Sequence, residues 1–167
     1  APVAPQVAAP KGEPLPYRWT HGNAEKARKA MIDTFGRAWL TPGNFVWAEA
    51  MPADGGAKII VDLLTQTASA YKGDVLVGAA SISSAKTGKV TPLGFWKVLD
   101  KRKMYRSKKY DNAPMPFMQR IDEYGIALHG GVNPGYPASH GCVRMPMKFA
   151  EKLFGLTKLG TEVVIEG

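Results

Sequence analysis

The sequence contains one cysteine, Cys142, in 167 residues. A single thiol cannot form an intramolecular disulfide, which excludes the disulfide-stapled class of small secreted domains. The chain also lacks any run of about 18 consecutive apolar residues, so we expect no membrane-spanning helix. CxxC and HExxH motifs are absent as well, and with them the common spacings of zinc ligands. A chain of this length is therefore expected to rely on an ordinary hydrophobic core.

Acidic residues are scarce relative to basic ones. Fourteen Asp and Glu stand against 22 Lys and Arg, which gives a net charge of +8. A basic surface favours acidic partners such as nucleic acid, anionic lipid or an anionic cell-wall polymer, although solubility alone also accounts for it. Zinc-finger spacing, a helix-turn-helix pattern and RNP-type aromatic motifs are all missing, so we expect no nucleic-acid partner.

The N-terminal third divides into two segments. Residues 1–16 are rich in proline and alanine and show no hydrophobic periodicity, which predicts a linker or tail without a signal peptide. Residues 17–52 are interpreted as a helical extension that packs on the main domain. Its stretch "NAEKARKAMIDTFGRAWLTPG" is typical of a helix capped by Asn23 and stopped by Pro42 and Gly43. The apolar stripe of this helix is expected to contain Ala30, Met31 or Ile32, Phe35 and Trp39.

The remaining residues, 53–167, are dominated by strand signals. Short runs of residues that suit strands alternate with turn residues, and "KGD" at 72–74 is a hairpin-like turn. One late helix is expected in "MKFAEKLFG", with Pro146 near its first turn and Gly155 after its end. The fold class is therefore mainly β with a late helix, either a sandwich or a closed sheet. Strands are expected within residues 58–66, 67–83, 94–100, 124–130 and 161–167.

Cysteine and histidine lie close together in "YPASHGCVRMP", residues 136–146. His140 is two residues from Cys142, and His129 ends the strand-like "YGIALHG" upstream. An imidazole that takes the thiol proton would leave a thiolate–imidazolium pair, which is an activated nucleophile. A buried, inert thiol and a Cys/His/His metal site are the alternatives that these residues leave open.

Gly141 separates the second histidine from the cysteine. A glycine lets the backbone turn sharply, so that successive N–H groups converge on one point. The N–H groups of Gly141, Cys142 and Val143 are thus candidates to bind the negative oxygen of a tetrahedral intermediate.

"HGGVNPGYPASHGCVRMP" resembles the signature of the YkuD-type L,D-transpeptidases, in which His-Gly is followed by a loop and then by Ser/Thr-His-Gly-Cys. The resemblance extends over roughly residues 57–167, and includes "SISSAKTGKVTPLGFWKV" and the last strand "GTEVVIEG". Ala85 and Trp96 depart from the family pattern, at positions away from the cysteine. The resemblance implies a β-sandwich catalytic domain over residues 53–167, preceded by the helical extension.

The resemblance also implies a role for individual residues. Cys142 would be the nucleophile, His129 the general base and later acid, and the carbonyl of Gly130 the group that orients the imidazole. Arg144 would organise the site or meet a substrate carboxylate. Further residues would support the loop (Ser139, His140, Gly141, Val143), bind substrate (Tyr124, Tyr136) or line the cleft (Met115, Phe117). For Met115 and Phe117, ordinary core packing is the favoured interpretation.

The function that the resemblance implies is acyl transfer on peptidoglycan stem peptides in the periplasm or cell envelope, without a metal or other cofactor. The acceptor would be an amine such as that of meso-diaminopimelate, giving 3→3 cross-links, and carbapenem β-lactams would acylate Cys142. The alternatives are an L,D-carboxypeptidase that uses water, and a non-catalytic wall-binding module. The basic run "KVLDKRKMYRSKKY", residues 97–110, is either a solvated hairpin or a contact for carboxylates of the wall polymer.

Overall fold

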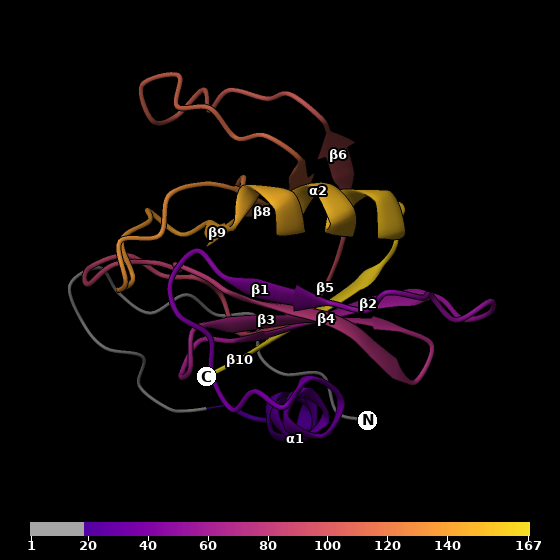
Figure 1. Cartoon of the computed structure of the whole chain (residues 1–167). Coiled ribbons are helices and arrows are strands. Elements are labelled where there is room, and N and C mark those ends of the chain that lie inside the picture. The colour runs from indigo at the N-terminus through magenta and orange to yellow at the C-terminus, as the bar shows by residue number, and fades with distance from the viewer. Residues whose placement is uncertain (1–18) are drawn as a thin grey trace.

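The computed structural model describes residues 19–167, which form two packed β-sheets and two helices (Figure 1). The larger sheet has six strands in the order β1-β4-β3-β2-β10-β5. All of its neighbouring pairs are antiparallel except β2 with β10, the last strand of the chain. Its strands are β1 (Phe45–Trp47), β2 (Ala57–Asp62), β3 (Thr67–Lys72), β4 (Val75–Ser81), β5 (Gly94–Lys97) and β10 (Glu162–Glu166).

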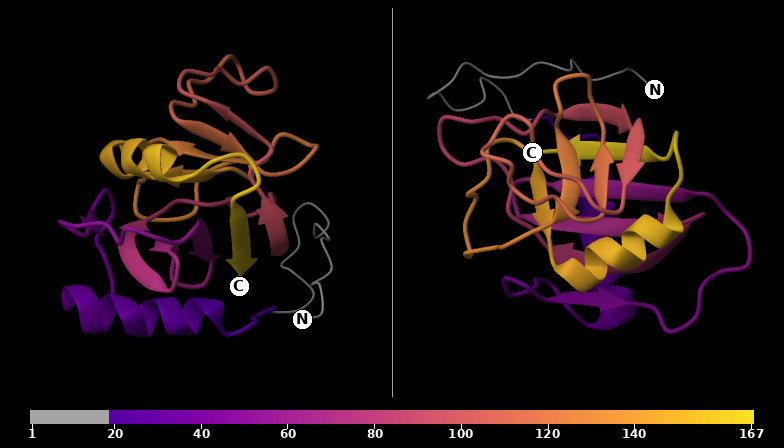
Figure 2. Two further views of the ribbon diagram at one scale, coloured as in Figure 1. Left: turned by 90° about the vertical axis from the view of Figure 1, so that its right-hand side faces the viewer. Right: turned by 90° about the horizontal axis from the view of Figure 1, so that it is seen from above.

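The smaller sheet has four strands in the order β6-β7-β8-β9. The pair β8–β9 is parallel and the other two pairs are antiparallel. The sheet packs with helix α2 on one face of the larger sheet, and helix α1 covers the opposite face (Figures 1 and 2). The strands of the smaller sheet are β6 (Asp100–Arg102), β7 (Met118–Arg120), β8 (Ala127–Gly130) and β9 (Val143–Met145). The prediction of a mainly β sandwich with a late helix is confirmed.

Coverage on both faces explains the continuous apolar runs in the central strands. In β2, Ile59 and Val61 face the main core, whereas Ile60 between them faces α1. The same alternation places Val164 of β10 on the α1 side. A strand that is buried on both faces is apolar at every position rather than at every second one.

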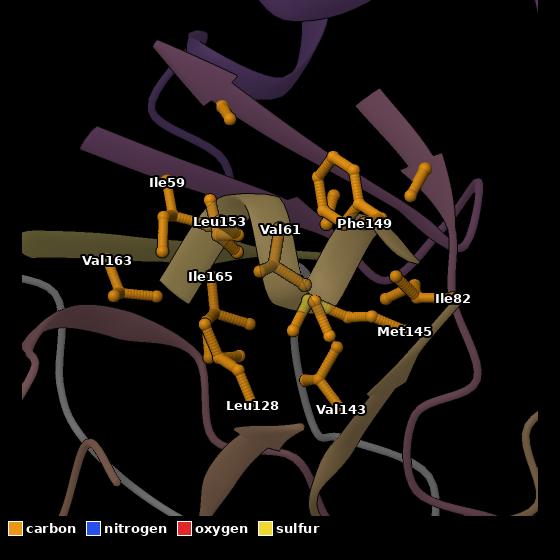
Figure 3. Close-up of a cluster of buried hydrophobic side chains, with 14 of the residues drawn as sticks. Ile59, Val61, Ile82, Leu128, Val143, Met145, Phe149, Leu153, Val163 and Ile165 are labelled. Atoms are coloured by element: carbon orange, nitrogen blue, oxygen red, sulfur yellow. The ribbon is translucent and has the colours of Figure 1, made fainter. Parts of the chain in front are cut away.

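The main core lies between the larger sheet, the strands β8 and β9, and α2 (Figure 3). The apolar side of α2 contributes Phe149 and Leu153, both fully buried. Leu128 of β8 and Val143 of β9 are also fully buried and point into this core. Because side chains alternate along a strand, the residues that flank Leu128 and Val143 point to the opposite face of the smaller sheet.

The two helices differ from their predicted limits. Helix α1 (Asn23–Phe35) begins after Gly22 without a side-chain cap and ends at Gly36, whose φ of 68° is left-handed. The prediction that Asn23 caps this helix is wrong, and Trp39 lies beyond the helix with 69% of its surface exposed. Helix α2 (Met147–Leu156) begins after Pro146 as predicted, but it includes Gly155 rather than ending before it.

The N-terminus of α1 is capped from the far end of the chain. The buried carboxylate of Glu166, in β10, accepts hydrogen bonds from the backbone N–H groups of Asn23 (3.1 Å) and Ala24 (3.0 Å) and from Thr20 Oγ1 (2.9 Å). Trp19 and Gly167 also exchange two main-chain hydrogen bonds, of 3.0 and 2.9 Å. Residues 19–52 are therefore joined to the main domain at α1 and, through β1, within the larger sheet.

The basic run 97–110 forms strand β6 and the first half of a loop over residues 103–117, which extends away from the sheets (Figures 1 and 2). Lys101 Nζ donates hydrogen bonds to the carbonyls of Phe154 (2.7 Å) and Thr157 (2.8 Å), at the C-terminus of α2. Arg102 forms an ion pair with Asp100 at 3.0 Å. Lys101 therefore joins the run to the end of α2, and the loop beyond Arg102 is the part that approaches Cys142.

Candidate active site

The parallel pair β8–β9 brings the predicted histidine and cysteine together. His129 is paired with Arg144 in the register of the two strands, and Cys142 lies two residues before Arg144. Residues two apart along an extended chain point to the same face, so Cys142, Arg144 and His129 share the face opposite the core. All three side chains line one cavity of about 990 Å³.

This cavity lies between the smaller sheet and the 103–117 loop. Its walls also include the turn that joins β7 to β8, residues 122–126, and the first residue of α2. A concave, largely apolar space with a few convergent polar groups is the usual form of a small-molecule or peptide site. The polar and aromatic side chains of its lining include Lys108, Lys109, Tyr110, Arg120, Glu123, Tyr124 and His140.

The imidazole of His129 is held in one tautomer. Its Nδ1 lies 2.8 Å from the carbonyl oxygen of Gly130, and a carbonyl oxygen can only accept a hydrogen bond. Nδ1 therefore carries the proton and Nε2 of the neutral ring is free to accept one. This is the contact that the family resemblance implies for Gly130, and it gives His129 the form that a general base requires.

The thiol of Cys142 donates a hydrogen bond to a backbone carbonyl. Its Sγ lies 3.7 Å from the carbonyl oxygen of Gly125, in the 122–126 turn. That turn is shaped by the buried carboxylate of Asp122, which accepts hydrogen bonds from the N–H groups of Tyr124 (3.0 Å) and Ile126 (2.8 Å). Before any reaction the thiol proton is thus directed at the turn.

Burial favours the uncharged form of both reactive groups. It raises the pKa of the Cys142 thiol above its ordinary value, and the N–H of Ala127 opposes this effect only in part. Burial likewise lowers the pKa of His129, although the hydrogen bond to Gly130 acts in the other direction. Both shifts favour a neutral thiol beside a neutral imidazole. The thiolate–imidazolium pair considered from the sequence is therefore not the resting state that this geometry favours.

Gly141 occupies a position that strongly favours glycine. Its φ is 142°, and a Cβ atom there would lie 2.6 Å from Ile126 Cδ1 and 3.0 Å from the carbonyl oxygen of Val90. Its carbonyl accepts a hydrogen bond of 2.7 Å from Thr91 Oγ1. The predicted need for glycine is explained by this close approach between the loop and the neighbouring segments.

The Gly141 N–H group is already used within the loop. It donates to Ser139 Oγ at 3.1 Å, and that hydroxyl in turn donates to the carbonyl of Cys142. In this structure Gly141 therefore supports the loop rather than offering its N–H to an oxyanion. Val143, the first residue of β9, pairs with Leu128 in the strand ladder. The N–H of Cys142 itself is the remaining candidate of the three.

The scaffold of this loop comes from residues 83–91, to which sequence analysis assigned no role. Ser83 exchanges two main-chain hydrogen bonds with Arg144, and its hydroxyl bridges the carbonyl of Tyr136 and the N–H of Ala138. Thr91 connects Ala85 N to the carbonyl of Gly141. The resemblance of residues 81–98 to the family was the only sequence signal for this role, because these contacts join residues about 50 positions apart.

The guanidinium of Arg144 is directed at backbone carbonyls. It donates to Val132 (3.3 Å) and Ala138 (3.5 Å), so it holds both ends of the loop that precedes the cysteine. Of the two roles that sequence analysis offered, organising the site and binding a substrate carboxylate, these contacts supply the first.

The other predicted residues lie at different distances from the cavity. Tyr124 is 72% exposed and lines its wall, whereas Tyr136 is 63% exposed and lies outside the lining. The His140 ring stacks on Tyr110, with centroids 4.3 Å apart and planes inclined by 10°. Met115 is buried and also lines the cavity, while Phe117 packs edge-on against Phe154.

Within residues 19–167, no group of three or more His, Cys, Asp or Glu side chains is placed to hold a metal ion. In the same range no helix is long and apolar enough to cross a membrane.

Comparison with solved structures shows the same fold in proteins of one kind. An L,D-transpeptidase from Stackebrandtia nassauensis is 27% identical with a TM-score of 0.62, and the match covers 71% of this chain and 59% of that one. An L,D-transpeptidase from Xylanimonas cellulosilytica is also 27% identical, with a TM-score of 0.60 and coverages of 82% and 68%. The catalytic domain of the E. faecium L,D-transpeptidase, in a structure acylated by ertapenem, is 26% identical with a TM-score of 0.55 and coverages of 68% and 99%.

The chain thus spans less than two thirds of the S. nassauensis protein. No curated protein matches the sequence. The family model described as the L,D-transpeptidase catalytic domain, YkuD, matches residues 56–165, which is well over half of the chain. Together with the two-sheet fold and the Cys142–His129 site, this match shows that the chain belongs to the YkuD family of L,D-transpeptidase catalytic domains.

Proposed function

We propose that this chain is a cysteine L,D-transpeptidase that acts on peptidoglycan stem peptides through an acyl-enzyme on Cys142. The observation that carries the proposal is the convergence of Cys142 and His129 in one cavity, with Nδ1–H of His129 bound to the carbonyl of Gly130. A thiol nucleophile and a base whose free nitrogen is defined by a hydrogen bond are the parts that acyl transfer requires.

The first half-reaction forms a thioester. As Sγ of Cys142 bonds to the carbonyl carbon of the L-centre, Nε2 of His129 takes the thiol proton. The oxygen of the tetrahedral intermediate becomes negative and is bound by the N–H of Cys142, the main-chain donor of the nucleophile itself. The C–N bond then breaks, and His129 returns its proton to the nitrogen of the departing D-alanine.

The second half-reaction regenerates the thiol. An acceptor amine, such as that of meso-diaminopimelate on another stem, attacks the thioester carbon and gives a proton to His129. The C–S bond breaks, Cys142 recovers its proton from His129, and the new amide is a 3→3 cross-link. Water in place of the amine would make the protein an L,D-carboxypeptidase.

The resting state sets the order of these events. Because both pKa shifts favour the neutral forms of the thiol and the imidazole, we infer that proton transfer accompanies attack rather than preceding it. The thiol must first turn from the Gly125 carbonyl toward His129, and a substrate that fills the cavity promotes this rotation by displacing the thiol from the turn. The site of action is the cell envelope outside the cytoplasm, where the wall polymer is found.

The decisive experiment is intact-mass spectrometry after incubation with a carbapenem. We expect one covalent adduct on the wild-type protein and none on Cys142→Ala. Asp33→Asn, an exposed position on α1 outside the cavity lining, serves as a folded control that keeps the adduct. An unmodified wild-type protein would contradict an activated, accessible thiol and would favour the wall-binding module.

Product analysis with purified tetrapeptide stems separates the two enzymatic activities. Transfer gives a cross-linked dimer and one D-alanine for each dimer, whereas hydrolysis gives a tripeptide and D-alanine. We expect the dimer to dominate with wild-type protein, and both products to disappear with Cys142→Ala. Tripeptide as the only product would establish the carboxypeptidase instead.

A further inference from the structure

Basic side chains dominate the charged lining of the active-site cavity. Four are basic and one is acidic, and the acidic one, Glu123, is hydrogen-bonded to the phenol of Tyr124. Arg144 and Arg120 donate to backbone carbonyls, at Val132 and Ala138 and at Asp122 respectively. Lys108 and Lys109 remain, both exposed and both carried by the 103–117 loop.

The loop holds these lysines in place over the cavity. Its two halves are joined by the main-chain bonds from Ser107 N to Ala113 O (2.9 Å) and from Met115 N to Tyr105 O (2.8 Å). The Ser107 hydroxyl accepts hydrogen bonds from the N–H groups of Lys109 (3.2 Å) and Tyr110 (3.1 Å). The Tyr110–His140 stack then docks the tip of the loop onto the residues that precede Cys142.

Lys109 reaches across the cavity to the turn that also contacts the nucleophile. Its Nζ lies 3.5 Å from the carbonyl oxygen of Tyr124, and the next carbonyl along, that of Gly125, accepts the Cys142 thiol proton at 3.7 Å. The ammonium of Lys109 and the thiol of Cys142 therefore contact consecutive residues of the same turn.

Of the two lysines, Lys109 alone is among the groups that shift the pKa of the Cys142 thiol. Burial is the largest influence on the pKa of Cys142 and raises it, while the charges of Arg144 and Lys109 lower it. Lys108 is not among the groups that shift the pKa of Cys142.

The ammonium of Lys109 is available to a ligand. The ion pairs within residues 19–167 join Lys58 to Glu162, Arg102 to Asp100 and Lys148 to Glu151, and neither Lys108 nor Lys109 takes part. One long hydrogen bond uses one of three N–H donors, so two remain. An ammonium beside a partly desolvated cavity favours a carboxylate ligand.

The proposed reaction supplies a carboxylate at the required place. In the donor peptide, the residue that leaves is the last one, and its carboxylate carbon is three bonds from the carbon that Cys142 attacks. During attack this carboxylate must lie within a few ångströms of Sγ, and so beside the 122–126 turn that the thiol and the Lys109 ammonium both contact.

We propose that Lys109 is the specificity-determining residue that binds the free carboxylate of the leaving residue, and so restricts the acyl donor to peptides that end immediately after the scissile bond. This inference rests on the proposed function. Lys109 contributes binding and positioning, while bond making and proton transfer stay with Cys142 and His129. A donor that continues beyond the leaving residue, or that ends in an amide, loses the charged contact.

The test compares two donors, a tetrapeptide with a free C-terminal carboxylate and the same peptide as its C-terminal amide. A hydrogen bond to a charged group contributes on the order of 1.5–3 kcal/mol, so we expect wild-type kcat/KM for acylation to favour the acid by about tenfold or more. Lys109→Gln should remove most of this preference by slowing the acid far more than the amide. Lys109→Arg should keep it, and Lys103→Gln, on the same loop but outside the cavity lining, should leave it unchanged.

The ratio of the two rates distinguishes recognition from a structural role. If Lys109 only supports the loop, Lys109→Gln slows both donors equally and the preference survives, which overturns the proposal. Loss of the preference in Lys108→Gln, with Lys109→Gln unaffected, overturns it as well. Failure of the proposed function is seen separately, as wild-type protein that releases neither D-alanine nor alaninamide and forms no carbapenem adduct.

Discussion

The ring of Tyr110 lies flat against the imidazole of His140, with the ring centroids 4.3 Å apart. Tyr110 belongs to the 103–117 loop and His140 to the Ser-His-Gly-Cys motif, so this contact closes one side of the active-site cavity. The loop tip is a turn in which Ala113 N donates to Tyr110 O at 3.0 Å, with Asp111 and Asn112 both at positive φ.

Removal of this stack should open the loop without unfolding the domain. Aromatic pairs contribute about 0.5–1.5 kcal/mol beyond their burial, so Tyr110→Ala should lower the carbapenem acylation rate by up to about tenfold. Hydrogen exchange in residues 103–117 should become faster at the same time. Tyr110→Phe keeps the ring and should match the wild type in both measurements. Unchanged exchange in Tyr110→Ala would show that the loop is held by other contacts.

The free thiol should behave as a neutral, shielded group. Alkylating agents react with thiolate, and burial raises the pKa of Cys142 above the ordinary thiol value. The rate of alkylation by iodoacetamide should therefore still be rising above about pH 8.5, where an ordinary thiol is half ionised. Cys142→Ala provides the blank, because the sequence has one cysteine. A plateau already reached near neutral pH would instead indicate a preformed thiolate–imidazolium pair.

Acylation should keep its rate at mildly acidic pH. The base must be neutral to accept the thiol proton, and burial lowers the pKa of His129 below its usual value of about 6.5. The acidic limb of the pH–rate profile for a carbapenem is therefore expected below that value, with full activity at neutral pH and loss as the pH falls through the lowered pKa. An acidic limb centred above the usual value would contradict this interpretation.

Gly141→Ala should abolish acylation, because the new Cβ would meet Ile126 Cδ1 at 2.6 Å and Val90 O at 3.0 Å at a φ that alanine rarely adopts. We expect a stability loss of about 1–3 kcal/mol as the loop is forced to shift. Gly155→Ala is the matched control. That glycine lies within α2 with open space around it, so alanine there should stabilise the fold by about 0.5–1 kcal/mol. Equal urea midpoints for the two variants would contradict the steric argument.

Glu166 should make the docking of α1 dependent on pH. Burial alone would raise the pKa of its carboxylate, but hydrogen bonds from Ala24, Asn23 and Thr20 outweigh it and hold the pKa below its usual range. The stabilisation that Glu166 gives to the docking of α1 is therefore fully present above the pKa of about 4.3 that this carboxyl has in the unfolded chain. It is lost as the pH falls through the lower pKa of the folded state.

Glu166→Gln should cost about 1–3 kcal/mol in urea unfolding at pH 7, since it removes a charged acceptor from three donors. The difference between variant and wild type should shrink as the pH falls below about 4. Glu162→Gln, an exposed position on the same strand, is the control and should change little. A difference that stays constant down to about pH 3 would show that the charge of Glu166 is not what holds α1.

Lys101 should affect stability rather than substrate. Its ammonium binds two carbonyls at the C-terminus of α2 and lies over the ring of Phe154, 4.2 Å from its centroid. Lys101→Met should lower the free energy of unfolding by about 1–2 kcal/mol, while Lys103→Met, which is exposed, should not. Binding of both variants to isolated cell wall should equal that of the wild type. Reduced wall binding by Lys101→Met at full stability would restore the interpretation of this part of the run as a wall contact.

The sequence alone determined the elements that depend on local patterns. The turn at Gly73 and Asp74, the strands on either side of it, and the start of α2 after Pro146 are all where the residue types indicate, because turn residues and apolar alternation act over a few positions. The motif around Cys142 likewise indicates the family by itself, because its Ser-His-Gly-Cys residues are consecutive in the chain. The predicted N-terminal cap of α1 was wrong because the cap is supplied by Glu166, 143 positions away from Asn23.

Only the tertiary structure decided how the site is assembled. The parallel pairing of β8 with β9 places His129 beside Arg144 and makes the face of Cys142 the wall of a cavity. The commitment of Arg144 to backbone carbonyls and the position of Lys109 near the thiol are contacts between segments that lie apart in the chain. Burial then sets the pKa values of the two reactive groups, and burial depends on the packing of both sheets and the 103–117 loop around them, which no local pattern of residues specifies.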